Sequence, residues 1–132
     1  MEKLKIIIEK SIDSYSAYAE NCSGIYGAGN SVDEVRKNVM EGLRLFIKYN
    51  EDNLPEILKK NYAVEYLYDI PSFLEYYSKV FTKSALGRIT GINQTQFSHY
   101  ISGFRKPSKK TVEKLDQAIH QLANELNQTH FI

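Results

Sequence analysis

The stretch of residues 82–108 constrains the fold more than any other part of the chain, and it reads TKSALGRITGINQTQFSHYISGFRKPS. Thr82 can cap a short helix over Lys83–Thr90, and Gly91 supplies the positive φ that ends it. Asn93 can cap a second helix over Gln94–Ser102, which ends at Gly103. This spacing predicts two short helices joined by a tight turn.

The two predicted helices have an apolar side and a polar side. We expect the apolar side to hold the pair together, through Ala85, Leu86, Ile89, Phe97, Tyr100 and Ile101. The polar side of the second helix carries uncharged hydrogen-bonding groups near its N-terminus, where a recognition helix meets base edges in the major groove of DNA. Glutamine can pair with adenine there, and basic residues in flanking loops commonly contact phosphates.

The DNA contacts predicted from this pattern combine base readers on the second helix with flanking cations. They are Lys83, Asn93, Gln94, Thr95, Gln96, Ser98, His99, Arg105 and Lys106. The competing interpretation is a solvated helix face that contacts nothing, with basic residues that serve solubility alone.

The same stretch resembles the helix-turn-helix of the Cro and phage-repressor type over about Ser84–Leu122. The resemblance is carried by the framework positions Ala85, Gly91, Phe97, Ser98, Gly103 and Pro107. Ile101 departs from it, because the family often has a polar or acidic residue there. The resemblance implies binding to double-stranded DNA.

Helical patterns also surround this stretch, so an all-α domain is predicted for residues 72–132. Ser72-Phe-Leu-Glu75 is typical of a capping box and predicts a helix from Ser72 to about Phe81. Ser108 can cap a long last helix with an apolar stripe of Val112, Leu115, Ile119, Leu122 and Leu126. Asp69-Ile-Pro-Ser72 interrupts the pattern and marks the predicted domain boundary.

Residues 1–71 predict an α+β domain. Leu4, Ile6 and Ile8 alternate as in a strand with one buried face, and Tyr15–Glu20, Ile25–Gly29 and Tyr62–Tyr68 are further strand candidates. Ser31 and Glu34 predict a capped amphipathic helix over Val32–Tyr49. The polar residues 50–61 predict a loop with a short helical turn at 56–60. The order β-β-β-α-β favours a small, largely antiparallel sheet with one helix packed on it.

The two predicted domains also differ in net charge. Residues 1–71 carry nine Lys/Arg and twelve Asp/Glu, whereas residues 72–132 carry eight and four. This asymmetry suggests two partners of opposite charge. A single cysteine excludes an intrachain disulfide, and three scattered histidines predict no zinc site. The short apolar run at 6–8 predicts neither a signal peptide nor a membrane span, so a cytoplasmic protein without metal or cofactor is expected.

Taken together, the two halves resemble a HicB antitoxin of a type II toxin-antitoxin system. The N-terminal resemblance covers Lys3–Tyr49 through the motifs IIIE, YSAYA and IYGAGNS, although Asn21-Cys22 stands where the family commonly has a proline. It implies a truncated ribonuclease H-like fold, which binds and neutralises a small basic ribonuclease toxin, HicA. It also implies a C-terminal domain that represses its own operon as a dimer or higher oligomer.

Two other functions compete with the antitoxin. One is a stand-alone transcriptional regulator whose N-terminal domain senses a ligand or dimerises. The other is a ribonuclease H-type nuclease, but Glu9, Asp13, Glu20 and Glu65 look like edge and surface charges, so no enzyme is expected.

The abundant tyrosines favour half-buried packing in the sheet. The alternative interpretation is that Tyr15, Tyr18 and Tyr26 line the toxin interface, because tyrosine is enriched at protein interfaces.

Overall fold

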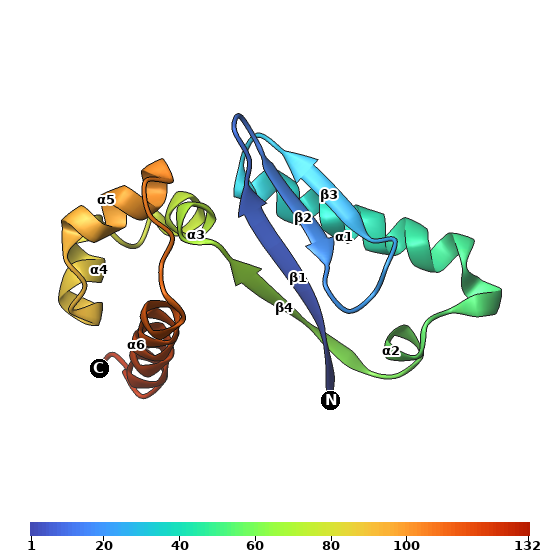
Figure 1. The fold of residues 1–132 in the computed structure, drawn as a ribbon. Helices are drawn as coiled ribbons and strands as arrows, with labels where there is room; N and C mark the ends of the chain where they lie inside the picture. The colour runs from blue at the N-terminus through green and yellow to red at the C-terminus, as the bar shows by residue number, and fades with distance from the viewer. The chain divides into compact units, whose positions relative to one another are not determined.

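The computed structural model describes all 132 residues and is of mixed α+β type, with two compact units. The first unit spans Met1–Tyr77 and the second Ser78–Ile132. Figure 1 shows that all four strands belong to the first unit.

The sheet of the first unit has the strand order β3-β2-β1-β4. Its strands are β1 (Glu2–Lys10), β2 (Tyr15–Ala19), β3 (Tyr26–Gly29) and β4 (Tyr62–Tyr68). β1 pairs antiparallel with β2, and β2 with β3, whereas β4 runs parallel to β1. A parallel neighbour requires a crossover connection, and the chain makes it through α1 (Val32–Tyr49).

Helix α1 covers one face of this sheet (Figure 1). The alternation predicted for β1 is confirmed, because Leu4, Ile6 and Ile8 are fully buried on that face. They pack with Val35 and Val39 of the helix in a single core. The helix has the bounds that its sequence predicted, and the Ser31 hydroxyl accepts from the Glu34 amide as expected.

The connection from α1 to β4 contains two short helical segments, η1 (Glu51–Asn53) and α2 (Glu56–Lys59). The predicted helical turn at 56–60 is therefore present. Ile57 and Leu58 of α2 are buried and close one end of the core.

Helix α3 (Ile70–Tyr77) begins two residues earlier than Ser72 and belongs to the first unit, not the second. The predicted capping box at Ser72 is wrong. The cap of α3 is Asp69, whose carboxylate accepts from the Ser72 amide in the first turn of the helix over 2.9 Å and from the Lys10 amide at the end of β1 over 2.8 Å. Ser72 is instead fully buried, and its hydroxyl has no hydrogen-bond partner.

The unit boundary therefore lies between Tyr77 and Ser78, whereas the sequence placed it between residues 71 and 72. The cause is the packing of α3. The Glu75 carboxylate accepts from the Val32 amide at the start of α1 over 3.0 Å, and the Tyr76 ring stacks on Tyr68 of β4.

The second unit contains α4 (Lys83–Thr90), α5 (Gln94–Ser102) and α6 (Lys109–Asn127), as the caps predicted. The expected apolar stripe of α6 is only partly covered. Leu115, Ile119 and Leu122 are half-buried, whereas Val112 and Leu126 are exposed. No helix of the chain combines the length and the apolar character needed to cross a membrane.

Candidate nucleic-acid interface

Helices α4 and α5 are separated by a three-residue turn that both helix ends stabilise. The Thr82 hydroxyl accepts from the Ala85 amide over 2.9 Å, and the Asn93 side chain accepts from the Thr95 amide over 2.7 Å. Gly91 ends α4 at φ +74°, in the left-handed region that costs other residues free energy. The local sequence therefore determines where each helix begins and where α4 ends.

A small buried cluster joins the two helices. Leu86 and Phe97 are each 1% exposed, and Ile92 in the turn is also buried. Thr90 fastens the turn because its hydroxyl donates to the Leu86 carbonyl over 2.6 Å and accepts from the Ile92 amide over 3.1 Å. Gly87 allows the close approach, since a Cβ there would lie 3.0 Å from the Ile92 carbonyl oxygen.

The predicted apolar side of this pair needs one correction. Ile89 is 37% exposed and does not face inward, because Leu86 and Thr90, one turn apart, form the buried side of α4. Ala85, Tyr100 and Ile101 are half-buried, as peripheral members of the cluster.

The polar side of α5 is exposed, and its residues are Gln94, Thr95, Gln96 and Ser98. None of their side chains forms a hydrogen bond within the chain, so all four are available to an external partner. Asn93 is exposed too, but its carbonyl oxygen is already used as the helix cap. Phe97 fixes the orientation of this surface, because its burial turns the residues on either side of it outward.

His99 differs from the other predicted contacts because it lies against a second aromatic side chain. Its ring is half-buried and lies 4.9 Å from the ring of Phe104, which is 70% exposed. The Arg105 amide donates to the His99 carbonyl over 3.3 Å, and the Arg105 guanidinium lies 5.8 Å from the same phenyl ring. Arg105 is thereby held close to the C-terminal end of α5.

The predicted phosphate contacts Lys83, Arg105 and Lys106 are exposed and form no ion pair. A further cation, Arg88, was not predicted. It lines a shallow hollow beside the start of α5 together with Asn93 and Gln94, and its guanidinium donates to the Ser84 hydroxyl over 2.8 Å. The i, i+4 spacing of Ser84 and Arg88 on the outer side of α4 was the sequence signal that could have identified it.

The three tyrosines predicted to contact a toxin do not form one surface. Tyr15 lies on the helix-covered face of the sheet and packs against the core, and this burial, together with Glu75 and Asp69, raises the pKa of its hydroxyl. Tyr18 and Tyr26 are paired in register on the opposite, open face and are 39% and 67% exposed. Of the three tyrosines, these two share the open face, where one partner can contact both.

Arg36 of α1 forms an aromatic cluster that the sequence did not reveal. Its guanidinium lies 4.0 Å from the ring centre of Tyr66 and 4.7 Å from that of Tyr76, and it donates to the Tyr68 hydroxyl over 2.6 Å. Burial opposes its charge, but the hydrogen bond to Tyr68 and the electrostatic interactions with Tyr68, Tyr66 and Tyr76 outweigh burial and raise the pKa of Arg36. The cluster joins α1 to β4 and α3.

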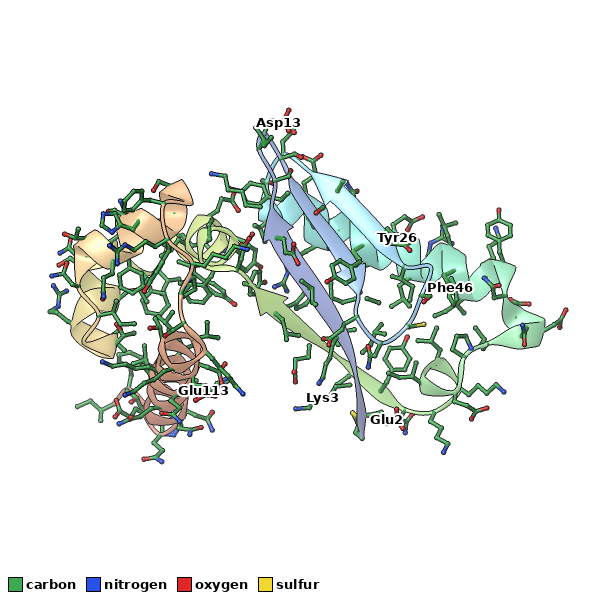
Figure 2. All side chains as sticks on the ribbon, in the orientation of Figure 1. Glu2, Lys3, Asp13, Tyr26, Phe46 and Glu113 are labelled. Carbon is green, nitrogen blue, oxygen red and sulfur yellow. The ribbon has the colours of Figure 1, made fainter.

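The four carboxylates considered for a nuclease do not converge. Glu65 pairs with Lys3 over 3.0 Å, whereas Asp13 lies at the tip of the β1–β2 turn, at the other end of the sheet from Lys3 (Figure 2). No group of three or more His, Cys, Asp or Glu side chains comes together in a way that could hold a metal ion.

Comparison of this chain with protein-family models, with curated proteins and with solved structures gives no match.

Proposed function

We propose that this chain is a DNA-binding regulatory antitoxin. Its second unit binds an operator through a helix-turn-helix formed by α4 and α5, and its first unit, a truncated ribonuclease H-like domain, binds and neutralises a small basic HicA-like ribonuclease toxin. The observation that carries the DNA-binding part is the polar side of α5. Four uncharged hydrogen-bonding side chains are exposed there without partners in the chain, on a helix whose orientation a buried phenylalanine fixes.

The charges of the two units support both parts of this proposal. Within the bounds that the structure gives, Met1–Tyr77 carries nine Lys/Arg and thirteen Asp/Glu, a net charge of −4. Ser78–Ile132 carries eight and three, a net charge of +5. A basic unit attracts the phosphate backbone, and an acidic unit attracts a basic protein.

One recognition helix reads few base pairs, so the operator-bound form is expected to be a dimer. Two copies of α5 placed about 34 Å apart would read the two halves of a palindrome. The partly exposed stripe of α6, with Val112 and Leu126, is the surface that we assign to this contact.

The DNA-binding part is tested by two pairs of substitutions. Gln94→Ala with Thr95→Ala is expected to lower affinity for a selected operator about tenfold or more while leaving non-specific binding unchanged. Arg105→Ala with Lys106→Ala should weaken binding to all duplexes. It should also reduce the slope of log affinity against log salt concentration by about one to two, as expected for the loss of one or two phosphate contacts. The measurement is fluorescence anisotropy at several salt concentrations, with an operator selected from random duplexes and a scrambled control. Equal behaviour of the two pairs would contradict the division into base and phosphate contacts.

The antitoxin part is tested by co-expression with the product of the neighbouring reading frame. A stable complex that relieves the growth arrest caused by that product alone supports the proposal. Absence of a complex, together with intact operator binding, would leave a stand-alone regulator as the better description.

A further inference from the structure

The open face of the sheet carries one apolar row that crosses all four strands. In the strand register, Tyr26 of β3 stands beside Tyr18 of β2, Tyr18 beside Ile7 of β1, and Ile7 beside Leu67 of β4. Three spacings between neighbouring strands make the row about 14 Å long. Neither the sequence of β1 nor that of β4 alone shows this row, because its members come from four separate segments.

The row is accessible. Tyr26, Tyr18 and Leu67 are 67%, 39% and 37% exposed, and Ile7 between them is half-buried. None of the four belongs to the core on the other face, where α1 packs. An open sheet face normally presents polar side chains, so a continuous apolar row on it marks an interaction surface.

Polar residues border this row on both sides. On one side the register places Ser16 of β2 beside Glu9 of β1. On the other side it places Lys5 beside Glu65, and Glu20 follows β2 with its amide bonded to the Lys5 carbonyl. An apolar centre with a polar rim is the usual arrangement of a protein interface, and tyrosine is enriched at its core.

The charge of the rim identifies the kind of partner. Glu65 is paired with Lys3, which leaves Glu9, Glu20 and Lys5 as the unpaired charges of the rim, a net charge of −1. The net charge of −4 of the whole unit adds to it. The net negative charge of the unit disfavours nucleic acid and a second copy of the same unit at this surface. It would attract a protein with an apolar patch surrounded by Lys and Arg.

We infer that the row Tyr26–Tyr18–Ile7–Leu67 is the surface on which the first unit docks a basic protein partner, with Glu9 and Glu20 at its rim. This inference rests on the proposed antitoxin function and specifies which surface of the unit performs it. The covered side of the sheet, including Tyr15, takes no direct part.

The test is affinity for the co-expressed product of the neighbouring reading frame, measured by calorimetry on the full chain. Tyr18→Lys and Leu67→Lys are each expected to weaken binding at least about tenfold, because each places a charge in the centre of a desolvated contact. Glu9→Lys with Glu20→Lys should mainly slow association and reduce its dependence on salt. Tyr49→Lys is the matched control, since this tyrosine is 75% exposed at the end of α1.

Circular dichroism and thermal denaturation of each variant establish that its first unit is folded. Should Tyr18→Lys or Leu67→Lys unfold the first unit, Tyr26→Lys at the more exposed edge position replaces it. Wild-type affinity in the folded row variants, or an equal loss in Tyr49→Lys, overturns this inference but leaves the antitoxin function standing. Failure of the wild-type chain to form the complex overturns both.

Discussion

Asp69 shows how one side chain can stabilise two elements. Its two carboxylate oxygens accept from the amides of Ser72 and Lys10, so it caps α3 and also binds the end of β1. A carboxylate that accepts at a helix N-terminus also interacts favourably with the helix dipole. Ser72 has the residue type and spacing of a cap, but it does not cap α3. Tertiary packing buries it within the first turn of the helix.

Substitution of these two residues by alanine is expected to have opposite effects. Asp69→Ala removes two hydrogen bonds and should lower the free energy of unfolding by about 2 kcal/mol. Ser72→Ala removes a buried hydroxyl that has no partner, so it should be neutral or stabilise by up to about 1 kcal/mol. Urea denaturation of both variants and the wild type measures this difference. A loss in Ser72→Ala as large as that in Asp69→Ala would mean that Ser72 is the cap after all.

At the scale of elements, two glycines determine how closely α1 approaches β3. A Cβ on Gly42 of the helix would lie 2.5 Å from the Tyr26 carbonyl oxygen. A Cβ on Gly27 of the strand would lie 2.5 Å from the backbone nitrogen of Val39. Both obstructing atoms are backbone, so neither can move without shifting the element.

Gly42→Ala is therefore expected to destabilise the first unit, although alanine favours a helix by about 1 kcal/mol over glycine. Overpacking of a closed contact costs about 1–3 kcal/mol, so we expect a net loss of up to about 2 kcal/mol and a lower thermal midpoint. Lys37→Ala, on the exposed side of the same helix, should change stability by less than about 0.5 kcal/mol. A thermal midpoint of Gly42→Ala above that of the wild type would show that α1 and β3 are further apart than this contact indicates.

At the scale of the whole molecule, the chain consists of two units of opposite charge whose boundary follows packing and not the break at Asp69–Ser72. Glu75 and Tyr76 tie α3 to α1 and β4. Because these contacts lie within Met1–Tyr77, the end of the first unit matters for its stability.

A fragment of residues 1–77 is expected to be folded and to melt at a higher temperature than a fragment of residues 1–71. The shorter fragment loses α3, the stacking of Tyr76 on Tyr68, and the acceptor for the Val32 amide. Thermal denaturation followed by circular dichroism compares the two. Equal midpoints would place the boundary where the sequence pattern suggested it.

The local sequence determined most of the elements, because caps, glycines and apolar periodicity act within a few residues of one another. The bounds of α1, α4 and α5 and the buried side of β1 follow from such signals, as does the polar side of α5. Only the tertiary structure decided which segments meet: α3 with the first unit, Thr90 in place of Ile89 at the buried side of α4, and Tyr18 with Leu67 on one face. Those outcomes depend on strand register and on packing between distant segments, and periodicity within one segment carries no information about either.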